Sequence, residues 1–206
     1  MANVRVMTRD GSVHGLDFID TVKDGPDPVW IDVSEPDEES LGILADAFGL
    51  HPLAIEDCLH GLQRPKMDEH GEMVFIIWVN PNPADLARPG DEIEFFLSDR
   101  LLISVHEAPS DAIEAAWSRD GEVLEMGTAW VLHAILDGMV DGYMPLLEDI
   151  GDELDEIEDS LLSNPAQALL SKLMRAKRSL VALRRIVGPE WDVLRQIARH
   201  SIVSRE

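Results

Sequence analysis

Two adjacent carboxylates in the stretch LHPLAIEDCLHGLQRPK, residues 50–66, are the first residues of this chain whose types and spacing could do chemistry. Glu56 and Asp57 should lie on a short helix that begins at His51-Pro52, because proline is favoured at the first helical position. That helix should end at Pro65. Neighbouring carboxylates can form part of a cation site or simply the polar face of an ordinary helix, and the stretch itself leaves both readings open.

Other motifs that could carry chemistry are weak. His60 lies four residues after Glu56 and three after Asp57, so on a helix either pair could share one metal, although such pairs are common by chance. Cys58 shares a helix face with Ile55 and is expected to be a small core residue rather than a nucleophile. The chain has no glycine-rich phosphate loop, nucleophile elbow or His-Glu-x-x-His motif. We therefore do not expect an enzyme.

Composition and charge narrow the class of protein further. The 206 residues are 45% hydrophobic and 28% charged, which is typical of a globular protein. The formal net charge is -23, and such a surface repels nucleic acid and attracts cations. No apolar run reaches membrane-spanning length, and the N-terminus lacks the apolar core of a secretion signal. The chain as given is expected to be soluble and cytoplasmic.

The first 125 residues alternate the signals of strands and helices. The run MVFIIWV, residues 73–79, is apolar throughout and predicts a central strand covered on both faces. Ser34 stands three residues before Asp37 and is the expected cap of a helix that ends near Gly49. Further strands are expected at 4–6, 13–18, 29–33, 92–97 and 101–106, with a hairpin at 98–100 and a helix at 110–117. These elements predict an α/β (α+β) domain over residues 1–125, a mixed β-sheet flanked by helices.

The remainder, residues 126–206, is expected to form a long antiparallel helical hairpin that leads toward a further helix. Two heptad seams, separated by Ser163-Asn164-Pro165, predict its arms. The first arm is acidic and the second basic, so opposite charges favour their pairing. Gly188-Pro189 should interrupt the second helix. The seam residues are Leu136, Val140, Tyr143, Leu147, Ile150, Leu154, Ile157 and Leu161 in the first arm, and Leu169, Leu173, Ala176, Leu180, Leu183 and Val187 in the second.

Several ordered motifs resemble the cytoplasmic domain of the CorA family of magnesium transporters. The stretch GLHPLAIEDCLHGLQRPKMDEHGEMVFIIWV, residues 49–79, carries the family's Gly-Leu-His-Pro-Leu, Glu-Asp and Gln-Arg-Pro-Lys motifs followed by a strand with Phe-Ile. The similarity continues through EIEFFLSDRLLISVHE, residues 92–107, and VLHAILDGMVDGYMPLLEDIGDELDEIED, residues 131–159. It covers essentially the whole chain from about residue 28 onward.

The resemblance implies a part of a membrane protein at the cytoplasmic face of the cell membrane. Family members are homopentameric channels for Mg²⁺, often also for Co²⁺ and Ni²⁺, with a stalk helix, two C-terminal membrane spans and a Gly-Met-Asn tripeptide at the pore. This sequence contains neither that tripeptide nor a span. It is therefore expected to be the Mg²⁺-sensing cytoplasmic domain of such a channel, monomeric or weakly associated as a fragment, with no nucleic-acid partner.

The resemblance also implies a set of metal ligands. Asp57 matches a ligand of the family's regulatory site, which forms between neighbouring subunits with an aspartate of the neighbour's stalk. Glu56 and Asp137 match residues of a second, weaker site, and Asp141 lies one turn beyond Asp137. The implied cofactor is regulatory Mg²⁺, with Co²⁺ as a further candidate, and binding should be weak in this fragment because the stalk is missing.

Two alternatives remain open at this point. Zinc-transporting relatives share the architecture implied by the resemblance, so the transported ion is not fixed. A free-standing soluble scaffold, whose acidic hairpin binds a basic partner, would also fit the charge pattern.

Overall fold

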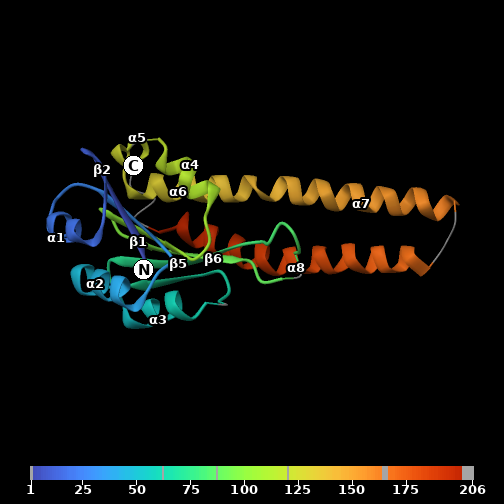
Figure 1. Cartoon of the computed structure of the whole chain (residues 1–206), viewed down its shortest axis with the longest axis horizontal. Coiled ribbons are helices and arrows are strands. Elements are labelled where there is room, and N and C mark those ends of the chain that lie inside the picture. The colour runs from blue at the N-terminus through green and yellow to red at the C-terminus, as the bar shows by residue number, and fades with distance from the viewer. Residues whose placement is uncertain (1, 62, 87, 120, 164–166, 201–206) are drawn as a thin grey trace.

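A seven-stranded mixed β-sheet lies between two layers of helices, and a pair of long helices projects from one side (Figure 1). The computed structural model describes residues 2–61, 63–86, 88–119, 121–163 and 167–200. The strands are β1 (Asn3–Thr8), β2 (Gly11–His14), β3 (Val29–Ser34), β4 (Lys66–His70), β5 (Met73–Asn80), β6 (Asp91–Leu97) and β7 (Leu101–His106). Their order in the sheet is β2-β1-β3-β7-β6-β5-β4.

The sheet is mixed because one of its strand pairs is parallel. β3 and β7 run parallel in the centre, and every other neighbouring pair is antiparallel. A tight turn joins β6 to β7, where the Ser98 amide donates to the Leu101 carbonyl at 2.8 Å. The expected mixed sheet flanked by helices is confirmed.

Different helices cover the two faces of the sheet (Figure 1). One face packs against α2 (Glu38–Phe48) and α3 (Pro52–His60), next to η1 (Leu16–Phe18) and α1 (Ile19–Val22). The other face packs against α4 (Asp111–Trp117), α5 (Glu122–Glu125), α6 (Thr128–Asp141) and the last turns of α8 (Gln167–Ile197). Both faces are therefore apolar, and β5 is buried along almost its whole length, as its sequence predicts.

Capping residues fix where α2 and α3 begin. The cap of α2 is Asp37, whose carboxylate accepts from the Ser40 amide at 2.8 Å while the Asp37 amide donates to the Ser40 hydroxyl. The prediction that Ser34 caps this helix is therefore wrong, because Ser34 still belongs to β3. Gly49 ends α2 in the left-handed conformation, and His51 caps α3 ahead of Pro52, as expected.

The edges of the sheet differ from the sequence-based expectation. The strand expected at 13–18 ends at His14, and η1 and α1 follow it. β4 was not expected at all, because its sequence KMDEH is mostly polar. Edge strands tolerate such sequences, since one of their sides faces water. β4 matters for the site because it begins at Lys66.

The projecting hairpin consists of α7 (Tyr143–Ser163) and the first part of α8 (Figure 1). The two helices run antiparallel as expected, and Arg175 on α8 pairs with Glu153 on α7 at 3.6 Å. α8 continues through Pro189, so the expected interruption at Gly188-Pro189 is wrong. The following turns are held in the core by Val193 and Ile197, and this packing offsets the ~3 kcal/mol that an interior proline costs.

In each predicted heptad seam, alternate residues are buried and the residues between them are largely exposed. Tyr143, Ile150 and Ile157 are buried on α7, with Ala176 and Leu183 facing them from α8. The alternate seam positions are between 36% and 46% exposed: Val140, Leu147, Leu154, Leu173, Leu180 and Val187. The side chain of Leu161 and the connector at 164–166 lie outside the described residues. The seams therefore predict the pairing, but one face of the hairpin is left apolar.

α6 packs on the sheet with the α/β layer rather than projecting with the hairpin. Val131, Leu132 and Ile135 of α6 share one apolar cluster with strand residues and with Val193 of α8. The projecting part therefore begins near Tyr143. The division of the chain at residue 125 stays a prediction.

A buried polar cluster anchors the base of the hairpin. The Tyr143 hydroxyl on α7 donates to the Glu190 carboxylate on α8 at 2.6 Å. Glu190 is 1% exposed, and burial raises its pKa to about 7, although the Tyr143 hydroxyl and the Val79 amide counteract this shift. Within the described part of the chain, neither the other Glu190 oxygen nor the Trp78 indole nitrogen has a hydrogen-bond partner.

We predict that Glu190 makes the free energy of unfolding depend on pH. Because its pKa is raised in the folded state, the folded chain retains a proton that the unfolded chain releases. Stability is therefore lost as pH rises from about 4.5 through about 7. The free energy of unfolding of the wild type, minus that of Glu190→Gln, should fall by roughly 1–3 kcal/mol across this window. Urea titrations at several pH values measure this difference.

The exposed Glu158 of α7 supplies the matched control. The stability difference between the wild type and Glu158→Gln should not change across the same pH window. A pH-independent difference for Glu190→Gln would show that Glu190 is ionised in the folded protein.

Candidate metal site

Asp57 lies on α3 in an ion pair with a lysine of the neighbouring edge strand. Its carboxylate is 2.8 Å from the Lys66 Nζ, which also lies 2.9 Å from Asp68 of β4. Burial alone would lower the pKa of Lys66, but the two carboxylates outweigh it and raise that pKa. The ammonium group of Lys66 therefore neutralises Asp57, the carboxylate that the resemblance identifies as a metal ligand.

Glu56, the other member of the pair, is exposed to solvent. The adjacent His60 is turned toward its own helix, with Nδ1 2.9 Å from the Glu56 backbone carbonyl. No group of three histidine, cysteine, aspartate or glutamate side chains within the described ranges is arranged to hold a metal.

Asp137 and Asp141 lie on α6, on the opposite face of the sheet from α3. Both are exposed. The four acidic residues that the sequence singles out are therefore divided into two pairs separated by the sheet. An ion that contacts both pairs would have to lie between two copies of the chain.

A buried polar cluster on the central strands is absent from the sequence-based expectations. Asp32 on β3 accepts a hydrogen bond from Ser104 on β7 at 2.5 Å, and His106 Nε2 lies 3.2 Å from the same oxygen. Serine, histidine and aspartate also form catalytic triads, but there the serine bonds to the histidine. Here both bond to the aspartate, and His106 Nδ1 lies 2.7 Å from the Ala108 carbonyl. The cluster therefore has no activated nucleophile.

Arg5 connects this cluster to the surface. Its guanidinium contacts Asp32 at 2.8 Å and Glu114 of α4 at 2.6 Å, and it lies over the Trp117 ring. Burial alone would raise the pKa of Asp32, but His106, Ser104 and Arg5 together hold it below its usual value. The cluster joins β1, β3, β7 and α4 as a structural unit.

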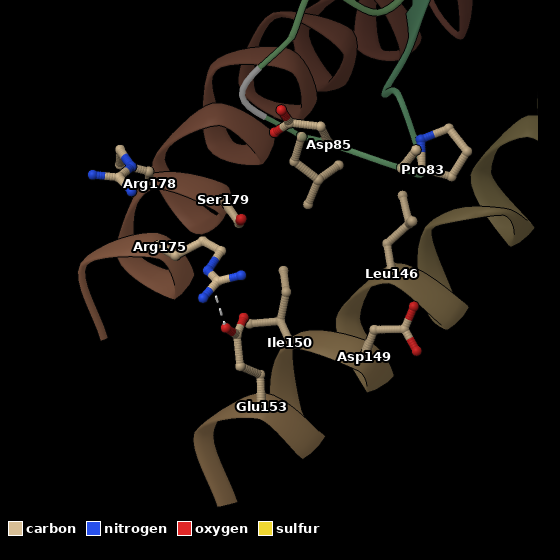
Figure 2. Close-up of a pocket in the computed structure, with 11 residues that line it drawn as sticks. Pro83, Asp85, Leu146, Asp149, Ile150, Glu153, Arg175, Arg178 and Ser179 are labelled. Carbon is tan, nitrogen blue, oxygen red and sulfur yellow. Dashed lines mark ion pairs between the residues drawn. The ribbon is translucent and has the colours of Figure 1, made fainter. Parts of the chain in front are cut away.

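A cavity of about 490 Å³ lies at the hairpin between α7, α8 and the loop at 81–90. Figure 2 shows Arg175 and Glu153 facing each other across it, from α8 and α7. Leu86 of the loop packs against Tyr143 and Ile150 beside the cavity. Acidic and basic side chains of the two arms pair beside this cavity. We therefore interpret the cavity as a gap in the packing of the hairpin and not as a ligand site.

Glu94 is a buried carboxyl that sequence reasoning missed. It lies on β6 and is 4% exposed. The signal was present, because Glu92 and Glu94 alternate with Ile93 and Phe95 in a strand whose two faces are covered. Glu92 and Glu94 therefore point to a face of the sheet that is covered by helices.

Comparison with known proteins shows the family. The model of the CorA-like Mg²⁺ transporter protein family matches residues 26–206. This chain belongs to that family, as its motifs indicate.

Relatives and solved structures agree with this assignment. The YfjQ protein of Bacillus subtilis is 31% identical over 82% of this chain and 53% of its own length. The cobalt/magnesium transport protein CorA of Thermotoga maritima is 27% identical over 86% of this chain and 52% of its own length. The soluble domain of CorA from Methanocaldococcus jannaschii has the same fold, with a TM-score of 0.76 at 21% identity, over 98% of this chain and 82% of that one.

The chain spans about half the length of these curated relatives. None of the described helices is both long enough and apolar enough to cross a membrane. The matched part has the fold of the family's soluble domain.

We predict that His106 stabilises the fold as an imidazolium, since both of its ring nitrogens face oxygen acceptors. Burial alone would lower the pKa of His106, but Asp32 outweighs it and raises that pKa. This stabilisation is fully present at a pH below the pKa of His106 in the unfolded chain, about 6.5. It is lost as pH rises through the higher pKa of His106 in the folded protein.

Unfolding by urea at several pH values tests this prediction. The stability of the wild type relative to His106→Gln should fall by about 1 kcal/mol or more as pH rises above about 6.5. His14 lies exposed on β2, and the stability difference for His14→Gln should stay constant. An equally constant difference for His106→Gln would mean that folding leaves the pKa of His106 unchanged, and a difference that rises with pH would mean that the folded protein holds His106 neutral.

Proposed function

We propose that this chain is the cytoplasmic regulatory domain of a CorA-type divalent metal ion channel that takes up Mg²⁺. The membership of the family carries the proposal, since the family model is named for Mg²⁺ transport and the Thermotoga maritima relative for cobalt and magnesium transport. Regulation by intracellular Mg²⁺, assembly into a homopentamer and anchoring by C-terminal membrane spans are further parts of the same proposal.

The position of Asp57 supports a regulatory role. Asp57 is half-buried at the edge of the sheet and is balanced by Lys66. A cation that binds Asp57 must displace or share this ammonium group, so binding is weak in an isolated chain. Mg²⁺ commonly contacts a protein through only one or two carboxylates and keeps its remaining waters. Asp57, with Glu56 beside it, provides that kind of contact.

The separation of the acidic pairs supports a site between subunits. Asp57 and Asp137 lie on opposite faces of the sheet, so each would face a different neighbour in a ring. Carboxylates brought together across such a border repel each other when empty and attract when a cation bridges them. Free Mg²⁺ would then bias the arrangement of the subunits.

The exposed half-seam of the hairpin supports self-association. Leu147, Leu154 and Leu180 leave an apolar face on the two long arms, and contiguous apolar faces of this kind commonly mark interfaces. In the proposed pentamer this face would be covered.

A zinc-transporting function is the second candidate. The zinc transport protein ZntB of Yersinia enterocolitica is 27% identical over 87% of this chain. Uptake of Mg²⁺ or Zn²⁺ into liposomes that carry the complete transporter would decide between the two. Mg²⁺ uptake that Zn²⁺ does not replace is expected, and uptake of Zn²⁺ alone would overturn the magnesium assignment.

We predict that Lys66 competes with Mg²⁺ for Asp57. Lys66→Met removes the ammonium, which lies 5.8 Å from the centre of the Phe75 ring, and keeps an unbranched apolar side chain of similar length. It should tighten Mg²⁺ binding by up to about thirtyfold, because a unit charge and a divalent ion ~4 Å apart in water interact by about 2 kcal/mol. Asp57→Ala should abolish the same binding event. Calorimetric titration of the 206-residue chain with millimolar Mg²⁺ measures both.

Lys172→Met is the matched control, because Lys172 is an exposed lysine of α8 that pairs with Glu156. Its titration should match that of the wild type. Unchanged binding after Asp57→Ala would remove Asp57 from the site, and unchanged binding after Lys66→Met would show that the ion pair does not compete.

A further inference from the structure

Glu94 is a carboxyl buried in an otherwise apolar layer of the sheet. In the antiparallel register it stands opposite Ile77 of β5, which in turn stands opposite Lys66 of β4. Opposed residues of an antiparallel pair point to the same face, so all three face the layer that contains α3. Ile77 and the next buried residue on this face of β6, Phe96, are apolar. Glu94 therefore occupies a position that packing alone would fill with an apolar side chain.

No cation of the described chain neutralises this carboxyl. Lys66, one strand further along, is engaged with Asp57 and Asp68. Within the described residues, Glu94 accepts a hydrogen bond only from its own backbone. Burial first, then the negative charges of Glu92 and Asp57, raise the pKa of Glu94 to about 8. Burying an unpaired carboxylate is costly, and the group can relieve this cost by taking up a proton or by pairing with a cation from solution.

The Glu94 side chain lines a cavity of about 380 Å³ between the C-terminal end of α3 and the start of β6. Among the residues that line it, those that can carry charge or ligate are Asp91, Glu92, Glu94, Glu107, Cys58 and His60. None of the described lining residues is a lysine or an arginine. The cavity thus combines a concentrated negative charge with an open path to solvent, since Asp91 and Glu107 are exposed.

We propose that this cavity binds a hydrated divalent cation of the Mg²⁺ type, with Glu94 as its innermost anionic group. The site is separate from the one formed by Glu56 and Asp57 on the outer side of α3. It is a second cation site of the domain and depends on different residues.

The geometry favours an ion that keeps its water shell. No three His, Cys, Asp or Glu side chains of the described chain are grouped to hold a bare ion, which favours contacts through water. Six waters occupy roughly 180 Å³ at the volume of the liquid, which fits within the cavity of about 380 Å³. Mg²⁺ gives up its waters reluctantly and is commonly held in this way.

Cobalt(III) hexaammine is the sharpest probe, because it has the shape of hexahydrated Mg²⁺ but does not exchange its ligands. Titration of the 206-residue chain, at a pH above the raised pKa of Glu94, should shift the backbone amide resonances of Gly61 and Gly90, which line the cavity. Mg²⁺ should cause the same shifts and compete with the probe. Glu94→Gln should weaken the binding by about fivefold or more, as expected for the loss of one nearby charge.

Control variants separate this site from that of Asp57. Glu72→Gln, which changes an exposed carboxylate of the β4–β5 turn, should bind as the wild type does. In Asp57→Asn the shifts of Gly61 and Gly90 should persist, so a failure of the proposed regulatory site would leave this result intact. Glu107→Gln should weaken binding of the probe to the cavity. Because Glu107 is exposed, this change leaves the buried groups of the cavity as they are.

Two results would overturn the proposal. One is the absence of shifts at Gly61 and Gly90 with millimolar probe. The other is equal affinity for the wild type and Glu94→Gln, which would make the shifts a general effect of the acidic surface.

Discussion

The burial of both faces of one sheet is the constraint on which the rest of this structure depends. β3, β5, β6 and β7 are covered by helices on either side, so each polar side chain on them must find a partner or remain an exception. Asp32 and Ser104 are partnered, through His106 and Arg5. Among the described residues, Glu94 has no cationic partner, and the Trp78 indole nitrogen has no hydrogen-bond partner. The same sheet separates α3 from α6 and so divides the acidic residues into two groups that a single chain cannot bring together.

The charges of this chain are distributed unevenly along the sequence. Residues 1–163 hold 37 acidic and 8 basic residues, whereas residues 164–206 hold 9 basic and 3 acidic ones. Within the hairpin the two signs face each other, as Lys172 with Glu156 and Arg175 with Glu153. Such exposed pairs contribute little stability each, and their main effect is to favour α7 against α8 over either arm with itself. The acids of α3 and β6 lie in a region with an excess of negative charge, which attracts cations from solution.

Sequence patterns predicted the elements whose signals are local. The apolar run of β5, the proline that opens α3 and the opposite charges of the hairpin arms all depend on neighbouring residues, and each was read correctly. The cap of α2 was placed three residues early because Ser34 and Asp37 are both good caps, and only the length of β3 decides between them. The sequence predicts a helix break at Pro189. The structure has none, because tertiary packing of Val193 and Ile197 in the core offsets the cost of the proline.

The candidate site was predicted only in part, for the same reason. Asp57, Glu56, Asp137 and Asp141 came from resemblance, and their roles as metal ligands stay predictions. The partner of Asp57 could not be read from the sequence, because Lys66 belongs to a polar edge strand that gives no strand signal. The burial of Glu94 depends on the register of β6 against β5, which fixes its face, and on α3, which covers that face.

α3 brings the two proposed cation sites into one electrostatic unit. Burial raises the pKa of both Cys58 and Glu94, and the charge of Asp57 on this helix adds to both shifts, so the carboxylate and the cavity interact electrostatically. A cation in the cavity would therefore stabilise the ionised form of every acid around α3 and weaken the hold of Lys66 on Asp57. By linkage, a cation at either site would weaken the binding of a second cation at the other, because like charges repel. α3, which carries the paired carboxylates Glu56 and Asp57, is thus the element that couples the buried Glu94 to the surface electrostatically.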